Sequence, residues 1–295
     1  MADKLRPILD AYLAGGMPPN IALMRLCMEA SSPEEMRAAV GEVGEGLTGL
    51  EAVRLEALAR LLDEHGSAWA TIRQVMDEAE HDHTALSSEE AVAYWASVFD
   101  RLAKAQPEAG VALYALGSPE LLARATAEIV EALRGWGLLA RSGHVLEIGC
   151  GIGRFVRALA PEVAAVTGID VSPGMIAAAR ERCAGLANVR LDVSSGRDLS
   201  GFDGGSFDLV LAVDVFPYLV QAGAKVAARH IAEAGRLLSR GGTLAILNYS
   251  YRGDLDGDRR EIAQAAGQAG FPRVDEPSPS FEYWDGSVFL LRKPA

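Results

Sequence analysis

The sequence predicts an α/β protein in which a doubly wound, mostly parallel sheet follows an all-α segment. Residues 144–155 (HVLEIGCGIGRF) pass from an apolar run through three alternate glycines into helical apolar spacing, as at a strand, a turn and a helix. Strand-like and helix-like segments then alternate toward the C-terminus. Residues 1–85 show helical spacing alone. We therefore expect a helical domain at 1–85 and an α/β domain at 86–295, with 86–140 as its helical lead-in.

The composition is typical of a globular protein. The chain has 295 residues, of which 49% are hydrophobic and 23% are charged, so it has enough apolar material for a large core. Its net charge of −12 argues against nucleic acid or an anionic membrane as a partner. The three cysteines, Cys27, Cys150 and Cys183, are far apart and odd in number, so neither a disulfide framework nor a zinc site is indicated. No secretory leader or membrane-spanning run is recognised, and we expect a cytoplasmic protein.

The first 85 residues contain several amphipathic segments. Residues 20–30, 32–43 and 49–64 place apolar side chains three and four positions apart, and Ser32 precedes a proline and two glutamates, as at a helix start. The apolar stripes could pack together, form a homodimer surface or cover an active site, and the sequence leaves these alternatives open. Residues 80–83 (EHDH) have metal-ligand side chains, but positions two apart do not share a helix face, so we expect no metal site.

The lead-in to the α/β domain is also predicted to be helical. Ser87 and Glu90 have the spacing of a capping box at the start of one helix. Ser118 and Pro119 begin another helix, which ends near Gly135.

The three alternate glycines indicate a cofactor site. Glycine can take a positive φ and lets a ligand lie against the backbone, and the following helix points free N–H groups at that ligand. A dinucleotide-binding fingerprint, G-x-G-x-x-G, would need glycine or alanine where this chain has Arg154. Glu147 also stands two residues before the first glycine, so the pattern is E-x-G-x-G-x-G.

This pattern resembles the first motif of the class I S-adenosylmethionine (SAM)-dependent methyltransferases. The resemblance implies a Rossmann-like sheet of seven strands with SAM as the cofactor. In that family the glycine turn, here Gly149, Cys150 and Gly151, lies against the methionine part of SAM, and the acid, here Glu147, acts on its ammonium group. A helical segment before the first strand often closes over the cofactor with an aromatic side chain near its carboxylate. Tyr114 is the candidate, although it could equally be a packing residue.

The end of the second predicted strand fits the same family. Asp170 follows the glycines by about 20 residues, where a carboxylate can accept hydrogen bonds from both ribose hydroxyls. It is followed by Val171 and, on the next helix, by Met175, which the resemblance places beneath the adenine.

The third predicted strand leads to the adenine contact. Many members of the family have an aspartate near position 195 that accepts from the adenine amino group, but this chain has Ser195. Ser195, the backbone of Gly196 or Arg197, and Asp198 are the candidates for this contact.

The fourth predicted strand ends at the acceptor side. Residues 207–213 (FDLVLAV) resemble the family's fourth strand, and Val213 leads into Asp214 and Tyr218 at the sheet edge where α/β proteins bind ligands. Planar-nitrogen methyltransferases have Asn or Asp, Pro, Pro and an aromatic residue here. The acid of this chain is one position too early, which disfavours methylation of adenine or an amide nitrogen. Asp214, Tyr218 and Tyr249 are the candidate catalytic bases for an acceptor that arrives protonated.

Together the motifs favour a SAM-dependent methyltransferase that moves a methyl group to an oxygen or nitrogen of a small molecule. This chemistry asks the protein mainly for alignment and a dry pocket. Two alternatives stay open: a regulatory protein that binds SAM without catalysis, and, less favoured because of Arg154 and Glu147, an NAD-dependent oxidoreductase.

Overall fold

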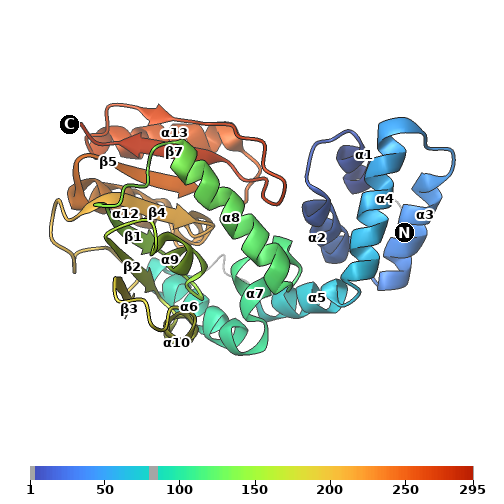
Figure 1. Cartoon of the computed structure of the whole chain (residues 1–295), viewed down its shortest axis with the longest axis horizontal. Coiled ribbons are helices and arrows are strands. Elements are labelled where there is room, and N and C mark those ends of the chain that lie inside the picture. Colours follow the sequence, from blue (N-terminus) through green and yellow to red (C-terminus); the bar gives the residue numbers. More distant parts are fainter. Residues whose placement is uncertain (1–3, 80–85, 295) are drawn as a thin grey trace. The chain divides into compact units, whose positions relative to one another are not determined.

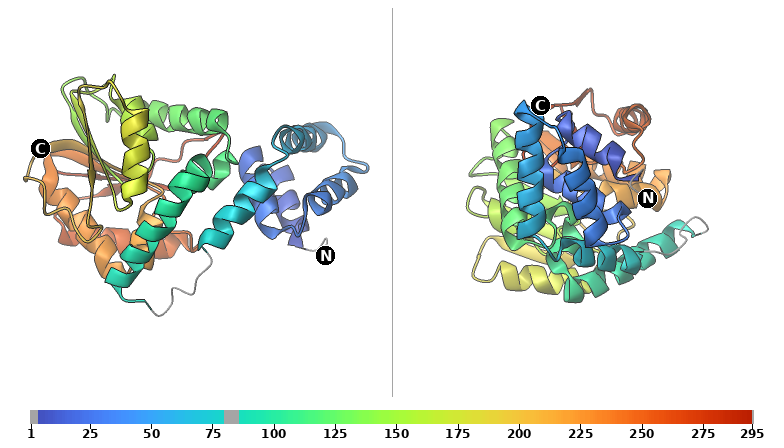
Figure 2. Two further views of the ribbon diagram at one scale, coloured as in Figure 1. Left: turned by 90° about the horizontal axis from the view of Figure 1, so that it is seen from below. Right: turned by 90° about the vertical axis from the view of Figure 1, so that its right-hand side faces the viewer.

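The computed structural model describes residues 4–79 and 86–294, which form two compact units (Figures 1 and 2). Among these residues, the first unit holds 4–79, 104–128 and 280–285, and the second holds 86–103, 129–279 and 286–294. The lead-in helices are therefore shared between the units, and a short C-terminal segment joins the N-terminal helices.

The first unit is all-α. Its elements are α1 (Arg6–Leu13), α2 (Pro19–Glu29), α3 (Pro33–Gly44), α4 (Gly49–Glu64), α5 (Ala68–Ala79), α7 (Pro107–Val111), the 3₁₀ turn η2 (Leu113–Ala115) and the first part of α8 (Pro119–Gly135). The predicted start of α3 is confirmed, because Ser32 Oγ accepts a 3.2 Å hydrogen bond from the backbone N–H of Glu35. Helix α2 packs against α1, α3, α4 and α5, and its apolar side chains are buried in the core of this unit.

Asn20 links three segments of this unit that are far apart in the sequence. Its side chain is buried, with 2% exposed, and its Nδ2 donates 2.9 Å hydrogen bonds to the carbonyl oxygens of Tyr114 and Tyr283. One amide thus satisfies a backbone group of the lead-in and one of the 280–285 segment.

The second unit contains a seven-stranded sheet in the order β3-β2-β1-β4-β5-β7-β6. The strands are β1 (His144–Ile148), β2 (Ala165–Asp170), β3 (Val189–Val193), β4 (Phe207–Val213), β5 (Leu238–Leu247), β6 (Val274–Asp275) and β7 (Val288–Arg292). The pairs among the first five strands are parallel, and β7 is antiparallel to both β5 and β6. The predicted fold class, a mostly parallel seven-stranded sheet preceded by helices, is confirmed.

Helices cover this sheet in the manner of a doubly wound fold. They are α6 (Ser88–Ala105), the end of α8, α9 (Arg154–Leu159), α10 (Pro173–Arg182), α11 (Phe216–Gln221), α12 (Ala224–Leu237) and α13 (Leu255–Gln268). The chain runs outward from β1 through β2 to β3 and then returns to β4 and β5, so right-handed crossovers put α9 and α10 on one face and α12 on the other. The main core fills the space between the sheet and the helices α12 and α13. Within residues 4–79 and 86–294, every helix is too short or too polar to span a bilayer.

Candidate functional site

The candidate site lies at the carboxyl ends of β1 and β4. These two strands are neighbours in the sheet, and the strand order reverses between them. Open α/β sheets bind ligands at such a reversal, because the loops there diverge to opposite faces. Of the predicted cofactor-binding and catalytic residues, all except Tyr114 belong to the unit that contains this sheet.

The glycine turn after β1 needs glycine for two reasons. Gly149, Gly151 and Gly153 all have positive φ, at 67°, 50° and 75°. A Cβ on Gly149 would lie 2.4 Å from a methyl carbon of Val215, which follows β4. The turn therefore touches the loop after β4 directly, and only a residue without a side chain fits.

Asp170 joins the glycine turn to the end of β2. Its Oδ2 accepts a 2.9 Å hydrogen bond from the N–H of Gly151, and its Oδ1 accepts one of 2.9 Å from the N–H of Ser172. Burial raises the pKa of this carboxyl, and backbone N–H groups of Ser172, Gly151 and Val171 oppose the shift. A carboxylate has about four acceptor positions, so the side chain can still accept hydrogen bonds from a ligand.

Glu147 is the most deeply buried acid of the site. It is 2% exposed at the end of β1, and its Oε2 has no hydrogen-bond partner. Burial raises its pKa to about 8, although the positive charge of Arg154 opposes the rise. A buried carboxylate oxygen without a donor is costly, and a ligand ammonium group would satisfy it.

Both carboxylate oxygens of Asp214 have polar partners. Asn248 Nδ2, after β5, donates a 2.6 Å hydrogen bond to Oδ1, and Arg154 Nη2 lies 3.7 Å from Oδ2. Asp214 and Asn248 both have positive φ, at 55° and 65°. Such backbone conformations in residues other than glycine are uncommon and cluster at functional sites. The orientation of Asp214 is thus set by residues that follow the strands on either side of β4.

Helix α6 contacts the loops that follow β2 and β3. Asp100 accepts hydrogen bonds from the hydroxyl of Ser172 and, at 2.8 Å, from the N–H of Gly174 in the first turn of α10. A Cβ on Gly196 would lie 2.6 Å from Val171 and 2.7 Å from Val92 of α6. These contacts bring the predicted ribose and adenine segments together beneath one helix.

Comparison with known proteins identifies this region. Residues 145–242 match the family model described as a methyltransferase domain. This part of the chain is a methyltransferase domain.

Two curated relatives and one solved structure illustrate the similarity. The demethylmenaquinone methyltransferase of Tropheryma whipplei (strain Twist) is 35% identical over 108 residues, 37% of this chain and 42% of that protein. The trans-aconitate 2-methyltransferase of Methylobacterium nodulans is 45% identical over 60 residues, 19% of this chain and 23% of that protein. The chain therefore spans at most 42% of the length of these relatives. The structure of magnesium protoporphyrin IX methyltransferase from Synechocystis PCC 6803 with bound SAM matches with a TM-score of 0.51 and 22% identity, over 71% of this chain and 98% of that one, which shows the fold.

Aromatic rings gather beside Asp214 in the methyltransferase domain. The ring of Tyr218 lies 4.6 Å from that of Trp95 and 5.1 Å from that of Phe99, both on α6, and 6.3 Å from that of Tyr251. Burial, followed by the charge of Asp214, raises the pKa of Tyr218. The hydroxyl of Tyr218 therefore keeps its proton at neutral pH.

Tyr249 lies in a different environment from Tyr218. It is 2% exposed, its ring stacks on Phe216 with centroids 5.7 Å apart, and its hydroxyl is hydrogen-bonded to Glu261 of α13. Burial is the main reason that its pKa is also raised. This side chain belongs to the hydrophobic core and reaches α13.

The other predicted cofactor residues divide into buried and exposed groups. Cys150, Met175, Gly196 and Val213 are buried, Val171 is half-buried, and Ser195 and Arg197 are exposed. Burial raises the pKa of the Cys150 thiol. Tyr114 is buried in the first unit. The segment 80–83 lies outside the described residues, and within the described ones no group of histidine, cysteine and acidic side chains could hold a metal ion.

Three residues contribute to the site although no sequence motif marks them as site residues. Arg154 stands out in the sequence only as a departure from the dinucleotide motif, and Asp100 and Asn248 belong to no motif. Asparagine is enriched at positive φ, which is a weak signal for Asn248 at a strand end. Nothing local marks Asp100, because its partners are 72 and 74 residues away.

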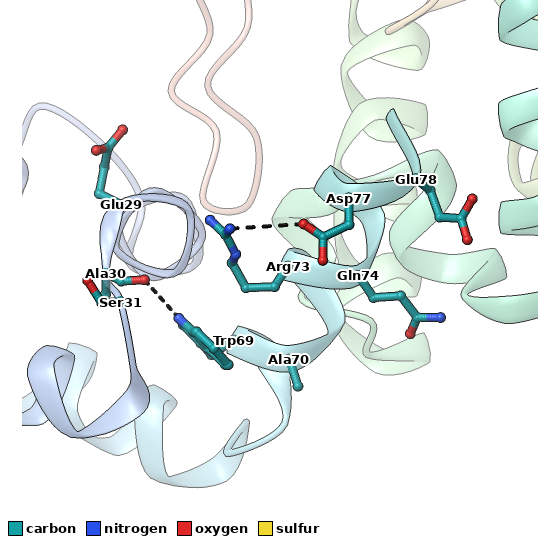
Figure 3. Close-up of a pocket in the computed structure, with 9 residues that line it drawn as sticks. All are labelled: Glu29, Ala30, Ser31, Trp69, Ala70, Arg73, Gln74, Asp77 and Glu78. Atoms are coloured by element: carbon teal, nitrogen blue, oxygen red, sulfur yellow. Dashed lines mark hydrogen bonds and ion pairs between the residues drawn. The ribbon is translucent and has the colours of Figure 1, made fainter. Parts of the chain in front are cut away.

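A separate hollow of about 870 Å³ lies in the first unit, between the end of α2 and α5 (Figure 3). Its lining includes Trp69, whose indole N–H donates a 3.0 Å hydrogen bond to the carbonyl of Ala30, and Arg73, which pairs with Asp77 at 4.0 Å. None of the predicted site residues lines this hollow.

Proposed function

We propose that this chain binds SAM and transfers its methyl group to an oxygen or nitrogen atom of a small molecule. The proposal rests on the arrangement of Glu147, the glycine turn and Asp170 near the point where the strand order reverses, with Asp170 hydrogen-bonded to the turn. The buried, unpartnered oxygen of Glu147 fits an ammonium group, and the remaining acceptor positions of Asp170 fit a pair of ribose hydroxyls. The residues present therefore fit SAM.

In this proposal each side chain has a defined task. Glu147 holds the ammonium group, the backbone of residues 149–151 lies against the methionine part, and Asp170 holds the ribose. The adenine is held by Val171, Met175, Ser195, Gly196 and Arg197, and Val213 borders the cofactor at the end of β4. Tyr114 is the candidate beside the cofactor carboxylate. SAM supplies a methyl group on a sulfonium, which is already a good leaving group.

The chain's own contribution to the reaction is positioning and exclusion of water. The rings of Trp95, Phe99 and Tyr218 form an apolar cluster near Asp214, which supports an acceptor with an apolar or aromatic part. Asp214 is the candidate that can orient an acceptor or take its proton. The other two candidates are less suited to act as a base, because Tyr218 keeps its own proton and the hydroxyl of Tyr249 is hydrogen-bonded to Glu261. The relatives are named as methyltransferases of demethylmenaquinone and of trans-aconitate, which are both small molecules, and this also supports a small-molecule acceptor.

Titration calorimetry of the full chain with SAM, S-adenosylhomocysteine and NAD tests the cofactor. Binding of SAM and its demethylated product but not of NAD is expected, and binding of NAD alone would overturn the proposal. Transfer of a labelled methyl group to members of a panel of phenols, carboxylic acids and amines tests turnover. Tight SAM binding without transfer to any member would favour the regulatory alternative.

We also propose that the chain forms a homodimer through its N-terminal helices. Leu50 and Val53 lie one turn apart on α4 with 65% and 62% of their surfaces exposed, which supports an apolar contact there. Light scattering of the wild type and a Leu50→Glu/Val53→Glu variant tests it. A wild type that stays monomeric at high concentration would contradict the dimer.

A further inference from the structure

Arg154 is an unusual residue for its place in the fold. It begins α9 directly after the glycine turn, and its side chain is only 7% exposed. Among the residues that the structure describes, it is the one buried arginine or lysine. Its guanidinium lies over the ring of Phe155 at 4.2 Å, which supports a fixed position.

Arg154 acts on two acids from different strands. It forms the ion pair with Asp214 after β4, and its charge also acts on Glu147 at the end of β1. Asp170, at the end of β2, is the third buried acid at this edge of the sheet. One buried cation therefore acts on two of the three buried acids, Asp214 and Glu147.

We propose that Arg154 sets the charge of the cofactor site and so controls its preference between SAM and S-adenosylhomocysteine. The inference rests on the proposed function. SAM carries a sulfonium, an ammonium and a carboxylate, and thus one net positive charge, whereas S-adenosylhomocysteine has a neutral thioether in place of the sulfonium. In a poorly solvated site, an extra positive charge on the protein weakens binding of SAM relative to that of its product, whose net charge is zero.

The test is the ratio of the dissociation constant of S-adenosylhomocysteine to that of SAM, measured by calorimetry on the full chain. Arg154→Met should raise this ratio by at least about fivefold, since it leaves the nearby acids without their cation. Asp214→Asn should lower it, and the Arg154→Met/Asp214→Asn double variant should return to within about twofold of the wild type because the charge changes cancel. Arg154→Lys keeps the charge and should rescue the wild-type ratio.

Arg157→Met is the matched control on the same helix. Arg157 is exposed and donates a 3.2 Å hydrogen bond to the carbonyl of Arg182, so its loss should leave the ratio unchanged. A folded Arg154→Met protein with the wild-type ratio would overturn the inference. If that variant does not fold, an unchanged ratio in Asp214→Asn would overturn it equally. A wild type that binds neither compound would instead overturn the proposed function.

Discussion

The backbone N–H of Gly151 donates a 2.9 Å hydrogen bond to the carboxylate of Asp170. The two residues are 19 positions apart, and each belongs to a motif that the sequence identified separately. The bond makes the turn after β1 and the end of β2 one structural unit, so a change in either residue should affect both stability and cofactor binding.

Gly151→Ala should weaken SAM binding by at least about tenfold, because a Cβ would stand where the backbone faces the cofactor. Its positive φ of 50° should also cost about 1–2 kcal/mol of stability. Gly185→Ala is the control, since Gly185 has a φ of 84° and a Cβ there would meet no atom within 4 Å. Both variants should lose stability, but only Gly151→Ala should lose affinity in calorimetry. Equal affinities would mean that the cofactor does not lie on this turn.

Asp170→Ala should weaken SAM binding by about 1.5–3 kcal/mol, the scale of hydrogen bonds to a charged group. The variant should also be less stable, because the N–H groups of Gly151 and Ser172 lose their acceptor. Asp203→Ala removes an exposed acid of the same unit and should leave the affinity unchanged. If calorimetry finds the same affinity for both variants, the ribose is bound elsewhere.

The stability of the protein should fall as pH rises toward the pKa of Glu147. Burial raises this pKa to about 8 in the folded protein from an ordinary value of 4.5. Between these pH values the glutamate loses its proton in the unfolded chain but keeps it in the folded one, so rising pH favours the unfolded state. Glu147→Gln abolishes this proton release, which lowers the free energy of unfolding of the wild type by up to about 1.4 kcal/mol for each pH unit between the two pKa values. Urea unfolding at about pH 5.5 and about pH 8.5 should therefore show a smaller loss of stability in the variant than in the wild type. Parallel pH dependences would show that Glu147 does not titrate in this range.

Asp100→Ala should lower the free energy of unfolding by about 1–3 kcal/mol, because the hydroxyl of Ser172 and the N–H of Gly174 lose a charged acceptor at the start of α10. Glu89→Ala on the same helix is the control. Glu89 pairs with Arg197 at 3.3 Å, but both side chains are exposed, so its removal should cost about 0.5 kcal/mol or less. Urea unfolding that ranks the two variants alike would argue against the contact of α6 with α10.

Asn20→Ala should destabilise the first unit by about 2–4 kcal/mol, since the buried carbonyl of Tyr114 and the partly buried carbonyl of Tyr283 lose their donor. Asn20→Asp should cost more, because a carboxylate would face two carbonyl oxygens. Thermal unfolding of both variants gives the comparison. An Asn20→Asp variant that is more stable than Asn20→Ala would contradict the hydrogen bonds of Asn20 to Tyr114 and Tyr283.

The fold and its local signals could be predicted from the sequence, because they depend on residues close together in the chain. The glycine turn, the strand that ends at Asp170 and the helix starts at Ser32 and Ser87 all follow from residue type at fixed spacing. The structure bears out the capping box directly, since the N–H of Ser87 donates a 2.8 Å hydrogen bond to Glu90. The alternation of strands and helices predicted the parallel sheet in the same way.

The partners of the buried polar groups were decided only by the tertiary structure. Asp100 reaches a helix start 74 positions away, and Asn20 reaches a carbonyl 94 positions away. Arg154 meets Asp214 because β1 and β4 are neighbours, although β2 and β3 lie between them in the chain. Caps and turns are specified within a few residues, whereas burial and charge pairing depend on which distant segments the sheet and its helices bring into contact.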